Sequence, residues 1–120
     1  MTRLLRYTLV GAVATAAHYA LLALGVELGG WPAWLASGFG AVVGAQLAYF
    51  GNRRFTFAFG GDFAASWLKF QSTALAGALL GMLIVGSAVH FGWHYLAGQV
   101  LATLAVLLIT FAINRFWTFG

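Results

Sequence analysis

Cysteine is absent from this 120-residue chain, and charged side chains make up only 7% of it. Without cysteine the chain forms no disulfide and no thiolate metal site. Its 3 dispersed histidines show no metal-ligand spacing, so we expect neither a metal nor another cofactor. Hydrophobic residues account for 62% of the chain, and the mean hydropathy is +0.92. Such a chain has too little polar surface to enclose a water-soluble core, which predicts an integral membrane protein.

Four apolar runs are long enough to cross a bilayer, whose core of ~30 Å needs about 20 helical residues. They cover approximately residues 7–28, 32–51, 70–90 and 95–113. Short loops containing glycine and tryptophan follow the first and third runs. The first run, which follows Arg3 and Arg6, is longer than the ~7 to 15 apolar residues of a signal peptide, so we expect a retained helix. The sequence therefore predicts an all-α integral membrane protein with one domain over residues 1–120.

One motif occurs twice, which indicates an internal duplication. Tyr49–Phe57 and Phe111–Phe119 both read aromatic-x-x-Asn-Arg-x-aromatic-Thr-Phe, and the second copy begins 62 residues after the first. We therefore expect four transmembrane helices arranged as two repeats of two helices, over about residues 1–58 and 67–120.

The basic residues predict how the chain lies in the membrane. They occur at the N-terminus, between the second and third spans, and at the C-terminus, and four spans place all of these on one face. Because positively charged segments remain in the cytoplasm, we expect both termini there, with parallel repeats in the inner (plasma) membrane. The basic residues form no stripe beside stacking aromatics, so nucleic acid is not an expected partner.

The same topology argues against an enzyme. The only 2 carboxylates, Glu27 and Asp62, are expected on opposite membrane faces, where they cannot act as a paired acid and base. The chain also lacks a cysteine nucleophile.

Polar side chains inside the spans are costly in hydrocarbon and are therefore candidate functional residues. The candidates are Thr15, His18, Gln46 and Gln71. His18 has two interpretations. It is either a neutral imidazole bonded to a backbone carbonyl or threonine of a neighbouring helix, or a headgroup contact or proton site.

Cations and asparagines are expected to gather at the cytoplasmic helix ends. Guanidinium groups bind phosphate oxygens through paired hydrogen bonds, and basic pockets between helices suit anionic lipid headgroups. In the alternative interpretation, Asn52 and Asn114 cap helices while the basic residues anchor the topology. The predicted phosphate-binding residues are Arg6, Asn52, Arg53, Arg54, Lys69, Asn114 and Arg115.

Small residues recur at positions where helices approach closely in membranes. Ala36, Gly40, Gly44 and Ala48 form one stripe, and Gly77 with Gly81 forms a GxxxG pair. The stripes serve either packing within the chain or contacts in a homo-oligomer. We expect a homo-oligomer that uses these stripes.

The chain resembles the GtrA-like family of small four-helix membrane proteins. The resemblance rests on Arg6-Tyr7 leading into Val10-Gly11-Ala12 and Thr15, and on the two Asn-Arg-x-aromatic-Thr-Phe ends. The chain has Ala14 and His18 where many members have asparagine and an acidic residue. The resemblance implies translocation of a polyprenyl-phosphate-linked monosaccharide to the outer leaflet, for synthesis or modification of cell-envelope polysaccharide. The basic cluster would then hold the lipid phosphate, and Thr15, His18, Gln46 and Gln71 would line the sugar path.

Two other functions are compatible with the sequence. The first is a non-transporting subunit that recruits or stabilises a membrane glycosyltransferase. The second is a small proton-coupled exporter of cations. It is disfavoured because the basic face repels cations and the spans contain no membrane-central carboxylate.

Overall fold

The computed structural model describes residues 2–56 and 63–113, and this part of the chain is helical without strands. The helices are α1 (Thr2–Glu27), α2 (Ala33–Gly51), α3 (Phe63–His90) and α4 (Tyr95–Ile113). A short π-helical turn, η1 (Asn52–Thr56), continues α2.

Three helices are long and apolar enough to cross a membrane, over Leu5–Glu27, Ala33–Arg54 and Trp67–His90. A shorter apolar stretch, Tyr95–Ile109, lies in α4. The prediction of an all-α membrane protein with four helices is therefore confirmed. The observed helices α1 and α3 begin several residues before the predicted spans, because helical structure continues beyond the apolar residues that the span estimate counts.

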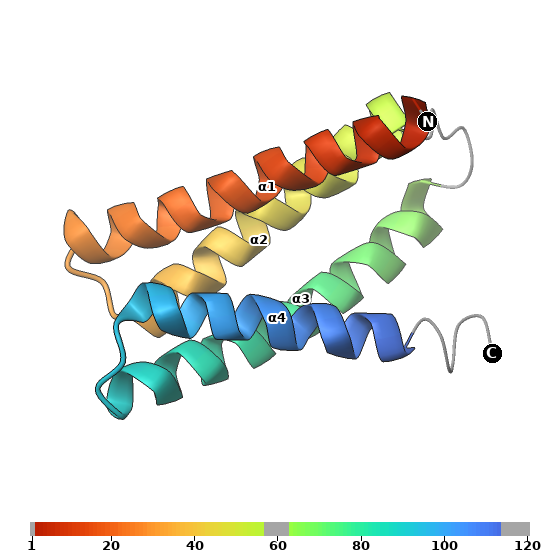
Figure 1. Cartoon of the computed structure of the whole chain (residues 1–120). Helices are drawn as coiled ribbons and strands as arrows, with labels where there is room; N and C mark the ends of the chain where they lie inside the picture. The colour runs from red at the N-terminus through yellow and green to blue at the C-terminus, as the bar shows by residue number, and fades with distance from the viewer. Residues whose placement is uncertain (1, 57–62, 114–120) are drawn as a thin grey trace.

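The helices form two hairpins, α1 with α2 and α3 with α4 (Figure 1). Consecutive helices pack along one another, so α2 and α3 join the two hairpins. We call the end with both short interhelical loops the loop end, and the opposite end, where α1 begins, the terminus end. The hairpins lie closer together at the loop end than at the terminus end (Figure 1).

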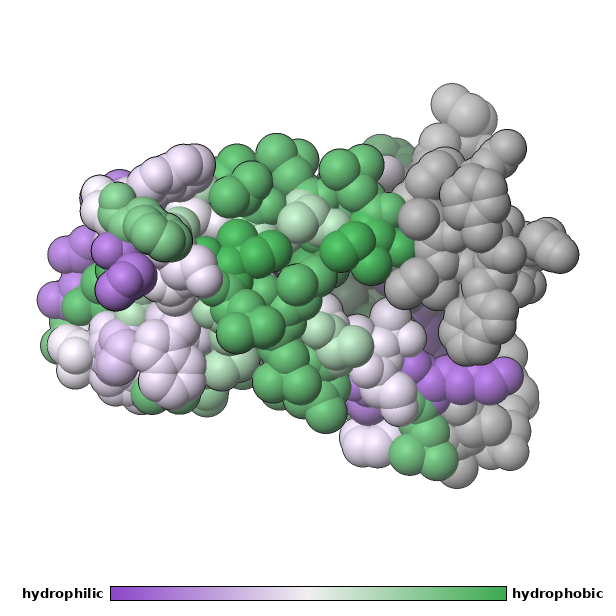
Figure 2. Space-filling model, turned by 90° about the horizontal axis from the view of Figure 1, so that it is seen from below, coloured by the Kyte–Doolittle hydropathy of each residue, from purple (hydrophilic) through white to green (hydrophobic). Residues whose placement is uncertain are grey.

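The surface in Figure 2 has an apolar band across its middle, with polar residues toward both ends. Large exposed side chains in the helices include Leu83, Leu107 and Leu108, which are 69%, 61% and 70% exposed. In water such exposure would oppose folding, whereas hydrocarbon solvates these side chains. The surface therefore matches the apolar helices expected in a bilayer.

The small residues of α2 pack against α1 within the chain. A Cβ atom on Gly40 would lie 2.7 Å from the His18 carbonyl oxygen, and one on Gly44 would lie 3.0 Å from the Ala14 carbonyl oxygen. The GxxxG residue Gly77 faces α4, where a Cβ would lie 3.3 Å from Val106. These contacts confirm packing within the chain, the first of the two uses that the sequence left open, and an oligomer interface at the stripes stays a prediction.

Asn52 occupies the C-cap position of α2, as the alternative interpretation expects. Its backbone is right-handed helical (φ −68°, ψ −38°), and its N–H donates to the carbonyls of both Ala48 and Tyr49. The chain continues helically into η1 instead of adopting the left-handed conformation of a common helix cap. Gly30 and Gly92 do adopt positive φ angles, +67° and +91°, in the two loops at the loop end.

Candidate functional site

A cavity of about 350 Å³ lies between the two hairpins and is lined by all four helices. We call it the central cavity. Its volume is at the lower end of the ~300–1,000 Å³ typical of small-molecule pockets. Gly11, Phe70 and Leu107 line it toward the terminus end, and Ser37 and Gln99 line it toward the loop end. Alanine and glycine form much of the remaining wall, which leaves room between the helices.

A hydrogen-bonded cluster closes the central cavity toward the loop end, and we call it the polar floor. The Ser37 hydroxyl donates to Gln99 Oε1 over 2.5 Å, and both side chains are buried. Gln99 Nε2 donates to Thr103 Oγ1 over 3.3 Å. His18 Nε2 lies 3.2 Å from the Ser37 carbonyl oxygen. The Tyr19 hydroxyl lies 2.7 Å from Thr103 Oγ1 and completes the cluster.

The polar floor obeys the rule that polar groups at membrane depth are satisfied within the protein. No buried side-chain nitrogen or oxygen in the described residues lacks a hydrogen-bond partner. The helical period explains how these residues meet. On α4, Gln99, Ala102, Thr103 and Val106 follow the i, i+3, i+4, i+7 spacing of one helix face and all line the central cavity.

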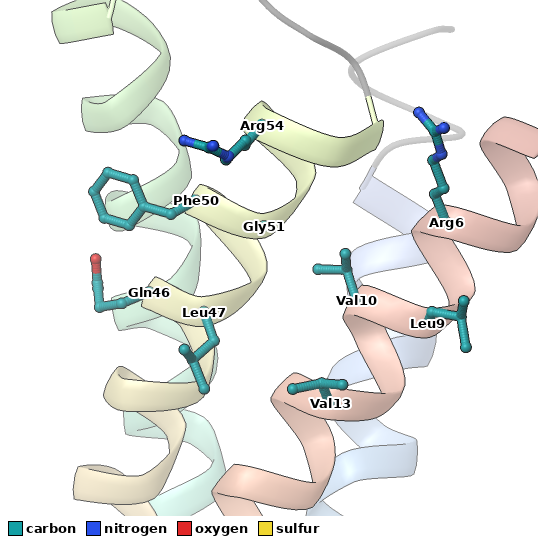
Figure 3. A pocket seen from close by; sticks show the side chains of 9 residues that line it. All are labelled: Arg6, Leu9, Val10, Val13, Gln46, Leu47, Phe50, Gly51 and Arg54. Atoms are coloured by element: carbon teal, nitrogen blue, oxygen red, sulfur yellow. The ribbon is translucent and has the colours of Figure 1, made fainter.

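A second hollow, of about 790 Å³, lies between α1 and α2 toward the terminus end (Figure 3). We call it the arginine groove. Its lining is Arg6, Leu9, Val10, Val13, Gln46, Leu47, Phe50, Gly51 and Arg54. Figure 3 shows Arg6 and Arg54 at the same end of the groove, with the apolar side chains following along both helices. The groove therefore combines cationic groups at one end with an apolar length.

The two hollows use opposite faces of α1. The arginine groove is lined by Arg6, Leu9, Val10 and Val13, and the central cavity by Gly11, Ala14, Thr15 and His18. At ~100° per residue the centres of these two sets lie more than a third of a turn apart on the helix. The α1–α2 contact consequently separates the arginine groove from the central cavity.

The structure divides the predicted sugar path into two places. Thr15 and His18 line the central cavity. Gln46 and Gln71 instead bond to one another across α2 and α3, with amide N···O distances of 2.7 and 3.0 Å. Gln46 also lines the arginine groove. The central cavity thus contains Thr15 and His18 in its lining, and the glutamine pair is a separate contact beside it.

The predicted phosphate-binding residues are also distributed. Arg6 and Arg54 line the arginine groove. Arg53 Nη1 lies 3.4 Å from the hydroxyl of Tyr49, whose buried ring packs edge-on against Phe70. Asn52 is half-buried in η1, and Lys69 is exposed on α3. Asn114 and Arg115 lie outside the described residues.

Comparison with protein families decides what kind of protein this is. Residues 6–119 match the family described as GtrA/DPMS, transmembrane domain. The chain belongs to this family. No curated protein and no solved structure matches the chain. The resemblance predicted from the sequence is therefore confirmed at the level of the family.

Family membership relates the chain to sugar–lipid translocation in membranes, and the GtrA/DPMS transmembrane domain is generally non-catalytic. In this GtrA/DPMS domain, the central cavity and the arginine groove have linings of two different kinds. Hydroxyl, amide and imidazole groups line the first, and guanidinium groups with apolar side chains line the second.

Sequence reasoning missed four residues of the polar floor: Tyr19, Ser37, Gln99 and Thr103. Ser37 and Gln99 are separated by 62 residues, which is the offset between the two copies of the terminal motif. Two polar residues at this spacing were the available signal, because the duplication makes Ser37 and Gln99 matching positions of the two hairpins.

Proposed function

We propose that this chain carries a polyprenyl-phosphate-linked monosaccharide from the cytoplasmic to the outer leaflet of the inner membrane, for cell-envelope polysaccharide synthesis or modification. The observation that carries the proposal is the arginine groove, an apolar hollow with Arg6 and Arg54 at one end. Guanidinium groups donate paired hydrogen bonds to phosphate oxygens, and the apolar length suits a hydrocarbon chain. The groove thus matches both parts of a polyprenyl phosphate.

The central cavity is suited to the sugar in a later step. Sugar and phosphate are bonded directly, and the α1–α2 contact separates the two hollows, so the lipid occupies the arginine groove and the central cavity one after the other. A hydroxyl moved into hydrocarbon without a partner costs about 2–7 kcal/mol, so a sugar needs hydrogen-bonding groups along its path. Thr15, His18 and the polar floor supply donors and acceptors, and the lining contains no carboxylate, lysine or arginine among the described residues. This chemistry favours an uncharged, hydroxyl-rich headgroup.

The distribution of basic residues supports a terminus end in the cytoplasm. In that orientation the central cavity faces the cytoplasm for loading, and the polar floor lies toward the outer leaflet. Arg53, Lys69 and Asn52, with Arg115 and Asn114, add phosphate-binding capacity at the loading end. A homo-oligomer remains part of the proposal.

The test replaces the two arginines of the groove. In proteoliposomes, Arg6→Gln with Arg54→Gln should lower flipping of a polyprenyl-phosphate sugar at least tenfold, because the lipid phosphate loses its charged donors. Arg6→Lys with Arg54→Lys is the matched control. It keeps both charges but not the paired donor geometry, so its rate should fall between the other two. Undiminished flipping by the glutamine variant, with unchanged helical content, would refute the phosphate role.

One observation favours a second candidate function. The polar floor closes the central cavity, so this conformation holds a headgroup without giving it a passage to the loop end. A chain that only presents the lipid to a membrane glycosyltransferase would need no such passage. Purified protein that flips nothing alone, but raises the activity of an added glycosyltransferase, would support this candidate.

A further inference from the structure

Two helix–helix interfaces join the hairpins, one between α2 and α3 and one between α1 and α4. We call these interfaces seams. The α2–α3 seam is closed along its length. Toward the loop end Met82 packs directly on Gly38, and toward the terminus end the rings of Tyr49 and Phe70 lie 5.2 Å apart. Between these contacts, each amide of the Gln46–Gln71 pair both donates and accepts a hydrogen bond.

The α1–α4 seam is joined near the polar floor. The Tyr19 hydroxyl bonds there to Thr103 Oγ1 and the Gln99 carbonyl, at 2.7 and 3.3 Å. In the described residues α1 does not pack along α4 as it does along α2, and the two helices diverge toward the terminus end (Figure 1). Thr15 on α1 and Leu107 on α4 line the central cavity and are exposed on this side.

The duplication has an offset of 62 residues, so α1 is equivalent to α3 and α2 is equivalent to α4. The α2–α3 seam is therefore equivalent to the α1–α4 seam. Adding 62 to Gln46 leads to Leu108, and subtracting 62 from Gln71 leads to Leu9. The positions that carry the paired amides are therefore leucines on α4 and α1, so the α1–α4 seam has no equivalent amide pair. Leu9 and Leu108 are 56% and 70% exposed.

This difference has a physical consequence in lipid. Two leucines gain little by meeting, since acyl chains solvate them as well as they solvate each other. Two amides gain a partner that hydrocarbon does not offer, so they hold their helices together. The sequence thus closes one seam with hydrogen bonds and leaves the equivalent seam free to be filled by lipid.

We propose that the α1–α4 seam, on the terminus-end side of Tyr19 and beside Gly11 and Leu107, is a lateral portal through which the uncharged, hydroxyl-rich headgroup of a membrane lipid reaches the central cavity. The Gln46–Gln71 pair is the latch that keeps the opposite seam closed. The inference rests on the proposed function for the identity of the headgroup. It also changes the role of Gln46 and Gln71, which sequence analysis assigned to the sugar path.

The first test measures the two seams without transport. Because the chain has no cysteine, introduced pairs are the only thiols. Gln46→Cys with Gln71→Cys and Gly11→Cys with Leu107→Cys are treated with methanethiosulfonate spacers of increasing length, and bridged protein is counted by mass spectrometry. The shortest spacers should bridge the first pair, and only longer ones the second. Bridging of both pairs by the same shortest spacer would overturn the portal.

The second test introduces a pair of glutamines into the portal. Gly11→Gln with Leu107→Gln introduces an amide pair into the α1–α4 seam and should slow flipping at least tenfold. The matched control, Gly11→Gln with Leu108→Gln, makes the same chemical changes but places the second amide about 100° further around α4. Equal rates for the two double variants would overturn the portal. An unmodified chain that flips nothing would refute the proposed function, and the spacer experiment would still decide the portal.

Discussion

Replacing Gly40 by alanine tests the close backbone contact between α1 and α2. Gly40 is buried on α2, and an added Cβ would lie 2.7 Å from the carbonyl oxygen of His18 and 2.8 Å from its ring atom Cδ2. The oxygen belongs to the backbone of α1, so it moves only if the helix moves. Gly40→Ala therefore forces α1 and α2 apart beside the polar floor.

The size of the effect follows from two opposing contributions. Overpacking costs about 1–3 kcal/mol, and alanine recovers about 0.5–1 kcal/mol over glycine inside a helix. Gly81→Ala provides the matched control, because its Cβ would lie 4.0 Å from Ala102 and gains the helical contribution without a clash. We expect the two variants to differ by about 2 kcal/mol, which is roughly 30-fold in the unfolding equilibrium.

The assay is reversible unfolding in mixed micelles with a rising fraction of dodecyl sulfate, followed by the fluorescence of the 5 tryptophans. Gly44→Ala adds an intermediate case, since its Cβ would lie 3.0 Å from the Ala14 carbonyl oxygen. The expected order of stability is Gly81→Ala, Gly44→Ala, Gly40→Ala. If Gly40→Ala unfolds at the same point as Gly81→Ala, the reasoning about the α1–α2 contact is wrong.

Three further predictions concern the polar contacts. Ser37→Ala leaves the Gln99 side chain without its donor and should lower the free energy of unfolding by about 1 kcal/mol in the same assay. Adding Gln99→Leu to this variant should recover much of the loss, because no unpaired amide remains. Additive losses from the two substitutions would contradict the pairing. Tyr19→Phe removes the hydroxyl that links α1 to α4 and should cost about 0.6 kcal/mol, with a wider α1–α4 separation in distance measurements between spin labels; an unchanged separation would count against this link. Glu27→Gln should leave the unfolding midpoint unchanged, because the Tyr95–Glu27 bond is exposed and the amide oxygen still accepts from the Tyr95 hydroxyl; a large shift would assign Glu27 a structural role.

The polar floor also shows how polar side chains keep hydrogen-bond partners at membrane depth in this protein. His18, Ser37 and Gln99 come from three different helices, and their bonds are all made within the chain. A hydroxyl-rich ligand that exchanged bonds with these groups would replace one set of partners by another. In hydrocarbon this exchange is far less costly than exposing either set without partners.

Much of the fold could be predicted because a membrane restricts the backbone. A chain in hydrocarbon must satisfy its backbone hydrogen bonds internally, so each apolar run of about 20 residues becomes a helix. The observed ends of α2, Ala33 and Gly51, lie within one residue of the predicted span, as does the Glu27 end of α1. The other end of α1 differs more, because polar residues before the span also adopt helical structure.

The arrangement of the candidate site could not be predicted in the same way. In a soluble protein the apolar face of a helix identifies the side that packs, but here lipid and protein interior are both apolar. Neither Gln46 nor His18 carries a sequence signal for the helix that it faces. Their separation into a glutamine pair and a cavity lining is consequently a result of helix rotation.

The sequence by itself determined the number and type of helices, the family and the positions of the basic residues, because these depend on local composition and on the length of apolar runs. The tertiary structure decided which polar groups meet. It brought Ser37 to Gln99, placed Arg6 beside the same groove as Arg54, and left the α1–α4 seam without a glutamine pair. The reason is that hydrogen bonds and close backbone contacts depend on helix rotation and separation, which hydropathy in a bilayer does not specify.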